Sequence, residues 1–115
     1  MATIYHIARS SDWPPTDGLY RGDTLETEGF IHCSTREQLL PVANRLFRGH
    51  TDLTVLVIDE ALVDSEIIYE NLEGGTERFP HIYGPLEAAA VLDTFAINAE
   101  SDGTFSSAPK LVRYS

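Results

Sequence analysis

The chain has 115 residues and carries 18 acidic against 8 basic side chains, a formal net charge of −10. A chain of this length buries enough surface for one hydrophobic core and too little for two, so we expect a single domain over residues 1–115. A hydrophobic content of 43% argues against intrinsic disorder. With Lys110 as its single lysine, the chain has no basic stripe for a phosphate backbone, which argues against non-specific nucleic-acid binding and anionic membranes.

Cysteine usage and the N-terminal residues indicate the compartment. Cys33 is the single cysteine, so an intramolecular disulfide framework is excluded and a reducing cytoplasm fits best. The first residues lack the basic and apolar regions of a signal peptide, and no apolar run approaches the roughly 18 residues that span a bilayer. We therefore expect a soluble, unprocessed, cytoplasmic protein.

Two short alternating runs predict strands in the first third of the chain. Residues 4–8 alternate and are mostly β-branched or aromatic. In residues 29–34, Phe30, His32 and Ser34 point to one side and the residues between them point to the core. If the two strands are neighbours, two histidines and a hydroxyl face a common surface.

The clearest predicted helix follows Ser34. Residues 34–37 (Ser-Thr-Arg-Glu) have the form of a capping box, and apolar residues then recur at helical spacing until Gly49. Because a proline inside a helix costs about 3 kcal/mol, the helix either begins near Pro41 or is kinked in its first turn.

The second half of the chain predicts mostly strands. They span residues 53–59, 67–72, 79–84 and 91–97, with a short helix over 86–90 that Pro85 begins, a polar loop over 99–109 and a closing strand over 111–114. The β-branched run of 53–59 is typical of a central strand covered on both faces. Pro80 restricts its strand to a sheet edge or a strand start. The order of elements predicts an α+β fold.

Three of the four histidines, His6, His32 and His81, lie in predicted strands, and His50 lies in a loop. Each strand histidine alone is as readily a core residue as a site residue. Three that point into one cleft would suit sugar hydroxyls or proton transfer near neutral pH. No paired-cysteine or H-x-x-x-H spacing occurs, so we expect no metal site, and we interpret Cys33 as a core residue.

Residues 32–34 (His-Cys-Ser) match the H-x-[ST] form of two-histidine phosphoesterases, in which two such strands face each other across a phosphate. The second copy is incomplete, since residues 81–83 (His-Ile-Tyr) offer a tyrosine hydroxyl instead. Glu70 lies within a predicted strand and is less readily interpreted as a solvated charge than the other nearby glutamates. Tyr20 could stack on a planar ligand or anchor its loop to the core.

Two blocks of the sequence resemble a known family. Residues 28–34 (Glu-Gly-Phe-Ile-His-Cys-Ser) and 79–86 (Phe-Pro-His-Ile-Tyr-Gly-Pro-Leu), together with Leu25 and Gln38, look like the signature of the bacterial domain-of-unknown-function 952 family. That family is grouped with the ADP-ribosyltransferase fold. The resemblance implies a split antiparallel β-sheet with one main helix and short helices, which grips NAD in a central cleft.

The resemblance also implies roles for the histidines. His6 would bond the ribose on the adenosine side of NAD, and His32 would lie against the nicotinamide side. His81 falls near the position where active transferases usually have a glutamate, and a protonated imidazole there would oppose positive charge on the sugar.

Our leading hypothesis is a domain that binds NAD or a related nucleotide, with ADP-ribosyl transfer or NAD cleavage as its activity. The expected catalytic residues are His32 and His81, and the expected cofactor-binding residues are His6, Arg9, Tyr20, Ser34 and Tyr83. Ser34 either helps at a ribose or only caps the helix. Arg9 and Arg21 are the nearest cations for a pyrophosphate. The alternatives are a non-enzymatic module that binds a metabolite or a partner protein, and the two-histidine phosphoesterase.

Overall fold

Strands make up most of the regular structure in the computed structural model, which describes residues 2–106. The strands are β1 (Thr3–Arg9), β2 (Leu19–Tyr20), β3 (Ile31–His32), β4 (Leu53–Asp59), β5 (Glu66–Glu70), β6 (Phe79–Tyr83), β7 (Leu86–Glu87) and β8 (Val91–Ile97). The helices are α1 (Leu25–Glu28) and α2 (Leu39–Leu46), and three single turns of 3₁₀ helix are η1 (Ser10–Asp12), η2 (Glu60–Leu62) and η3 (Ala88–Ala90).

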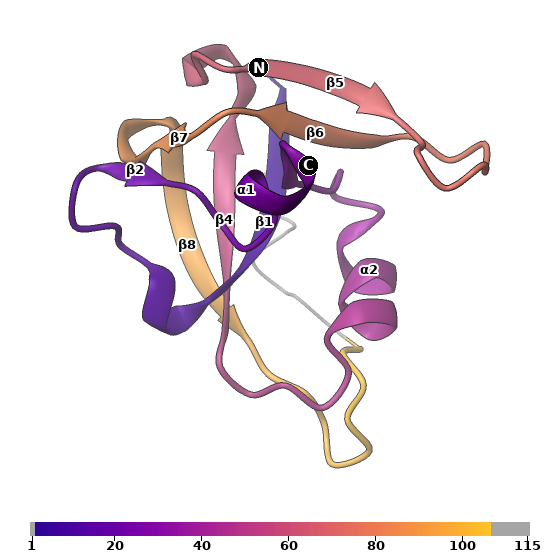
Figure 1. The fold of residues 1–115 in the computed structure, drawn as a ribbon. Coiled ribbons are helices and arrows are strands. Elements are labelled where there is room, and N and C mark those ends of the chain that lie inside the picture. Colours follow the sequence, from indigo (N-terminus) through magenta and orange to yellow (C-terminus); the bar gives the residue numbers. More distant parts are fainter. Residues whose placement is uncertain (1, 107–115) are drawn as a thin grey trace.

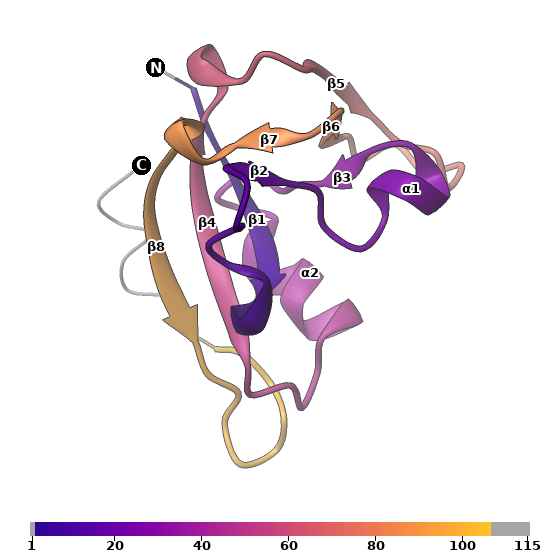
Figure 2. The same cartoon turned by 60° about the vertical axis from the view of Figure 1, so that its left-hand side comes forward.

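The strands of this part of the chain form three antiparallel sheets, in the orders β1-β4-β8, β2-β7 and β3-β6-β5. Figures 1 and 2 show that the strands of the two smaller sheets run across one end of β1, β4 and β8, and that α2 lies beside this first sheet. A mixed α/β arrangement of antiparallel sheets with few helices is therefore confirmed.

Strand β4 is buried on both faces, as its β-branched sequence predicts. Val55 and Val57 pack into a core cluster shared with α2. Leu56 and Ile58, which point to the opposite face, pack into a second cluster with residues of β2, β3, β6 and β7. All four side chains are fully buried, so the first sheet separates two hydrophobic layers.

The neighbouring strand β1 directs one histidine toward the smaller sheets. Tyr5 and Ile7 join the layer against α2, whereas Ile4 and Ala8 join the second layer. Because side chains alternate along a strand, His6 lies on the same face as Ile4 and Ala8. It therefore faces β2 and β3.

The predicted capping box over residues 34–37 is wrong, because α2 begins only at Leu39. The backbone N–H of Thr35 donates to Oε1 of Gln38 at 3.0 Å, so the side chain of Gln38 closes the turn that leads into the helix. Pro41 is then the third residue of the helix, where a backbone N–H has no partner within the helix. Its cost in the first turn is small for that reason.

Two further expectations are decided by the structure. Residues 86–90 do not form one helix, since Leu86 pairs with Tyr20 in the β2-β7 sheet and only the last three residues form η3. Strand β6 is central in its sheet, and Pro80 lies at its start, as the second residue, which is one of the two predicted positions. The predicted strand over 111–114 lies outside the described residues.

None of the helices within residues 2–106 is long and apolar enough to cross a membrane.

Candidate functional site

A single β-bridge joins the end of the β3 segment to β1. The N–H of Tyr5 donates to the carbonyl oxygen of Ser34 at 2.8 Å, and the N–H of Ser34 donates back to Tyr5 at 2.7 Å. This bridge holds His6 and His32 on adjacent segments. Ser34, predicted to bind a ribose or to cap the helix, is only 4% exposed and does not cap α2.

The turn before β3 places the second histidine opposite the third. Gly29 adopts a left-handed conformation (φ 88°) and ends α1, with its N–H donating to the carbonyl of Leu25 at 3.0 Å. Strand β3 then pairs with β6 so that His32 lies directly opposite His81. Their ring centroids are 5.2 Å apart, edge to face. The structure thus brings the three strand histidines together, and we refer to His6, His32 and His81 as the histidine cluster.

Both ring nitrogens of His6 are occupied within the protein. Nδ1 lies 2.5 Å from the backbone carbonyl oxygen of His32, and Nε2 lies 2.7 Å from the hydroxyl of Tyr20. Burial lowers the pKa of His6 to about 4, and the charge of a neighbouring protonated His32 acts in the same direction. His6 is therefore a neutral imidazole near neutral pH.

His81 is buried, with 5% of its surface exposed, and it contacts a carboxylate. Its Nδ1 donates to Oε2 of Glu70 at 2.9 Å, and the hydroxyl of Tyr83 donates to the same oxygen. These hydrogen bonds, from Tyr83 first and then from His81, lower the pKa of Glu70. Because the Tyr83 hydroxyl is bound to Glu70, residues 81–83 do not reproduce the second H-x-[ST] strand of a phosphoesterase.

Phe30 forms the apolar support of the cluster. Its ring stacks on His81 at a centroid distance of 4.2 Å and an interplanar angle of 19°. It also contacts the rings of His32 and Tyr83 at 4.7 and 5.2 Å. Phe30 is not among the residues that the sequence predicts for the site, although its position on the same side of the strand as His32 is the signal for it. Glu70 is likewise absent from the predicted site residues.

His32 is the exposed member of the cluster, since 46% of its side chain is accessible. Its Nε2 lies 3.3 Å from Oε1 of Glu28, which is also on the surface. Of the three histidines, His32 therefore has the ring most accessible to a ligand.

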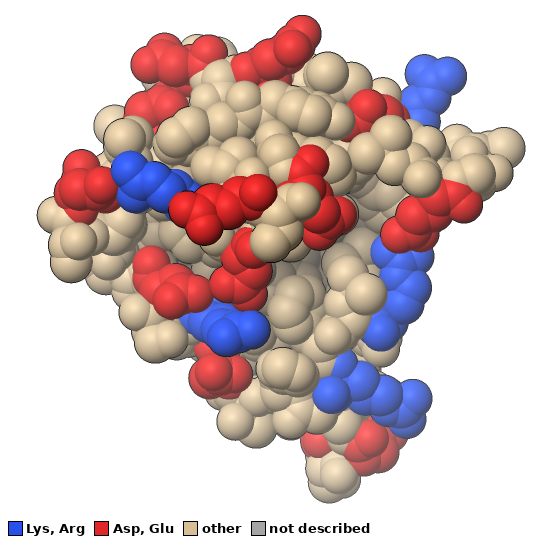
Figure 3. Space-filling model, in the orientation of Figure 1, with Lys and Arg blue, Asp and Glu red and all other residues tan. Residues whose placement is uncertain are grey.

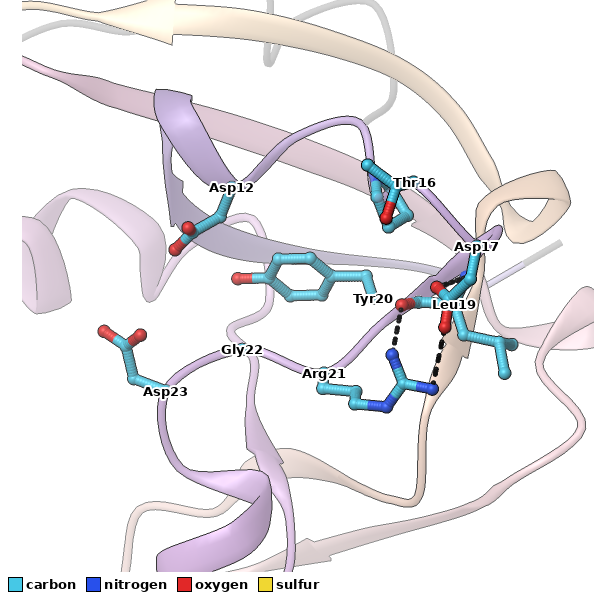
Figure 4. A pocket seen from close by; sticks show the side chains of 9 residues that line it. Asp12, Thr16, Asp17, Leu19, Tyr20, Arg21, Gly22 and Asp23 are labelled. Atoms are coloured by element: carbon cyan, nitrogen blue, oxygen red, sulfur yellow. Dashed lines mark hydrogen bonds and ion pairs between the residues drawn. The ribbon is translucent and has the colours of Figure 1, made fainter.

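A pocket of about 320 Å³ opens beside the cluster, around the ring of Tyr20 (Figure 4). It is lined by Asp12, Pro15, Thr16, Asp17, Leu19, Tyr20, Arg21, Gly22 and Asp23. Tyr20 is 4% exposed, and the ring of Trp13 packs edge-on against it at 5.9 Å, which anchors the loop as well. Because the hydroxyl of Tyr20 bonds to His6, this one side chain connects the pocket to the histidine cluster.

Of the two arginines predicted to serve a pyrophosphate, Arg21 lines this pocket and Arg9 contacts it only through Asp23, and both are paired. Arg21 forms an ion pair with Asp17 at 3.0 Å and also donates to the carbonyl of Leu19 at 3.2 Å. Arg9 forms an ion pair with Asp23 at 3.2 Å. On the face of the molecule drawn in Figure 3, basic side chains lie directly against acidic ones. The pocket therefore has a negative balance of charge.

The cysteine and the fourth histidine lie outside the site. Cys33 is buried, and burial raises the pKa of its thiol, so it is a core residue as predicted. His50 is exposed and contacts the ring of Phe47 near the end of α2. Within residues 2–106, no group of three or more histidine, cysteine or acidic side chains is arranged to hold a metal ion.

Comparison with known proteins identifies a family and a related protein of solved structure. The sequence profile described as "Protein of unknown function (DUF952)" matches residues 7–94. The crystal structure of protein CC0527 from Caulobacter crescentus has a TM-score of 0.85 and 28% identity, over 96% of this chain and 99% of that one. A solution NMR structure of the same protein has a TM-score of 0.77 and 30% identity, over 100% and 97%. Among proteins of curated function, none matches the chain.

Proposed function

The chain belongs to the DUF952 family of proteins of unknown function, and we propose that its histidine cluster and Tyr20 pocket bind NAD or a related nucleotide and cleave it. The observation that supports this most is the meeting of His6, His32 and His81 from three separate strands beside an open pocket. An ADP-ribosyltransferase-like fold is part of the proposal, since two three-stranded antiparallel sheets flank the cluster.

The accessible rings of the site suit the planar end of such a ligand. His32 is exposed above the buried ring of Phe30, and Tyr83 lies on the same support. A nicotinamide ring placed against His32 would stack on an exposed aromatic ring, with the carboxylate of Glu28 beside it. The ribose on the adenosine side would extend toward Tyr20.

Glu70 supplies the negative charge that the proposed cleavage requires. The bond between C1′ of the ribose and the ring nitrogen of nicotinamide breaks, and its electron pair leaves with neutral nicotinamide. A water or acceptor hydroxyl then bonds to C1′ and releases a proton. The positive charge that develops on the sugar is stabilised by a nearby carboxylate, and Glu70 is held ionised by Tyr83 and His81. Active transferases of the resembling fold usually have a glutamate near the position of His81. We assign the role of that glutamate, stabilising the positive charge on the sugar, to Glu70.

Calorimetry with NAD, ADP-ribose and nicotinamide tests the binding, and nicotinamide release from NAD tests the cleavage. We expect heat with NAD and ADP-ribose, and a release that His32→Ala abolishes. His50→Ala removes an exposed histidine that contacts Phe47 and is not part of the cluster, and it should leave both unchanged. Absence of heat with all three compounds would rule out the proposal.

A second candidate function is a non-enzymatic module that binds an unphosphorylated metabolite. The pairing of Arg9 and Arg21 with carboxylates favours it, because neither cation is held ready for a pyrophosphate. Adenosine that binds as tightly as ADP-ribose, without any release of nicotinamide from NAD, would support this function over the first.

A further inference from the structure

We infer that Tyr20 is the residue that contacts the ligand and that His6 is a positioning residue, which holds the Tyr20 hydroxyl as a hydrogen-bond acceptor. The site therefore selects a ligand that presents a hydrogen-bond donor to the Tyr20 oxygen. This donor is an unphosphorylated ribose hydroxyl, and a phosphate at the same position is rejected. The identity of the ligand rests on the proposed function, whereas the roles of the two residues rest on the hydrogen bonds alone.

The direction of each hydrogen bond at His6 follows from its partners. The backbone carbonyl of His32 can only accept, so Nδ1 of His6 carries the proton. In a neutral imidazole Nε2 is then an acceptor, and the hydroxyl of Tyr20 must donate to it. The Tyr20 oxygen has no second proton to offer. Only its lone pairs remain for a ligand.

His6 does not line the pocket, whereas Tyr20 does. Both nitrogens of His6 are already bonded within the protein, at 2.5 and 2.7 Å, which leaves neither for a ligand. The imidazole acts on the pocket only through the tyrosine. The assignment of His6 to direct ribose binding, which the resemblance implies, is therefore replaced by Tyr20.

The groups around the Tyr20 hydroxyl have the same acceptor character. Figure 4 shows the carboxylates of Asp12 and Asp23 on either side of the hydroxyl end of the ring. Arg21 directs its guanidinium away, to Asp17 and to the carbonyl of Leu19. A ribose hydroxyl can donate to these oxygens, but a phosphate brings two negative charges and few donors. The pocket thus discriminates against phosphate at this position.

Nitrogen-15 NMR of the histidine rings tests the positioning role without any ligand. We expect His6 to show a protonated Nδ1 and an unprotonated Nε2, and to remain neutral down to about pH 5, in keeping with its pKa of about 4. His32 and Asp23 are the other titratable groups that influence it. The opposite tautomer, or protonation near pH 6.5, would overturn the inference.

The affinities for NAD and NADP test the selectivity, since NADP carries a phosphate in place of one ribose hydroxyl. The wild-type protein should bind NAD about five- to tenfold more tightly. Tyr20→Phe should reduce this preference. His6→Asn keeps the donor to the carbonyl of His32 but its shorter side chain loses the acceptor for Tyr20, so it should also reduce the preference for NAD. His6→Gln can place an acceptor against the Tyr20 hydroxyl, so it should retain that preference. Tyr69→Phe, at an exposed tyrosine, is the control.

The outcomes separate the inference from the proposed function. Equal affinity for NAD and NADP overturns the selectivity while the proposed function stands. A preference that His6→Asn leaves intact overturns the positioning role. If neither nucleotide binds, the proposed function and the ribose assignment fail together, and the NMR result alone decides the role of His6.

Discussion

The Nδ1 atom of His81 donates a hydrogen bond of 2.9 Å to the carboxylate of Glu70 across the β5-β6 pair. The register sets Ile68 opposite His81, so Glu70 reaches the imidazole diagonally from two residues along its strand. Tyr83 donates to the same oxygen. The buried side of the histidine cluster therefore carries a fixed negative charge.

Substitution of Glu70 tests whether this charge acts in the reaction. Glu70→Gln should lower the rate constant of nicotinamide release by about 100-fold or more, since one well-placed electrostatic group contributes about that much. The affinity for ADP-ribose should change little, because ground-state contacts remain. Single-turnover release and calorimetry measure the two effects. Glu73→Gln, in the exposed turn after β5, is the matched control, and an equal effect of both variants would contradict the role.

The stability of the protein should depend on the titration of His6. Its pKa falls from 6.5 to about 4 on folding. The unfolded chain therefore takes up a proton in this range that the folded chain does not, so stability is full above pH 6.5 and decreases as the pH falls toward 4. The free energy of unfolding should lose about 2–3 kcal/mol through this residue. Urea unfolding across this pH range measures it.

The carboxylates also titrate in acid, so the comparison must be made between variants. His6→Gln should show a shallower decrease of stability below pH 6.5 than His50→Gln, which removes an exposed histidine. Parallel curves for the two variants would show that His6 does not titrate as described.

Release of the paired arginines should strengthen the binding of phosphate-bearing ligands. Asp17→Asn and Asp23→Asn leave Arg21 and Arg9 without their ion-pair partners. We expect the affinity of the double variant for ADP-ribose to rise about fivefold at low salt, and the gain to shrink as salt screens the charges. The double variant Glu26→Gln, Glu73→Gln removes the same charge outside the pocket. A similar gain in that control would attribute the effect to net charge alone.

Gln38 should be important for the start of α2. Its side chain accepts from the N–H of Thr35 at 3.0 Å and donates to the carbonyl of Arg78 at 2.7 Å. Gln38→Ala leaves these groups without partners at an 8% exposed position and should cost about 1–3 kcal/mol of stability. Glu37→Ala, at the exposed position that the original capping box assigned to this role, should cost less than about 0.5 kcal/mol. Thermal or urea denaturation distinguishes the two, and the reverse order would favour the Ser34 cap.

The thiol of Cys33 should be protected until the protein unfolds. The side chain is 3% exposed, and burial raises its pKa, so little thiolate forms in the native state. Reaction with a disulfide reagent at about pH 8 should therefore follow the unfolding rate. The denatured chain, in which the same thiol is accessible, gives the reference rate. Native labelling at the reference rate would show that Cys33 is not a core residue.

Local sequence patterns predicted the long strands well. The strands expected over residues 53–59 and 91–97 coincide with β4 and β8. Their β-branched and apolar residues favour an extended backbone wherever they are packed. Residues 86–90 were misassigned because the pairing of Leu86 with Tyr20 is a contact between distant segments, which a local pattern does not contain.

The sequence by itself determined the acidic balance, the strand positions of His6, His32 and His81, and the membership of a family. Only the tertiary structure decided which of their hydrogen-bonding groups remain for a ligand. Both nitrogens of His6 are taken by His32 and Tyr20, and Arg21 is taken by Asp17. The reason is physical: a hydrogen bond or a close ion pair depends on the positions of two groups within about 3 Å, and strand pairing sets those positions between segments that are far apart in the chain.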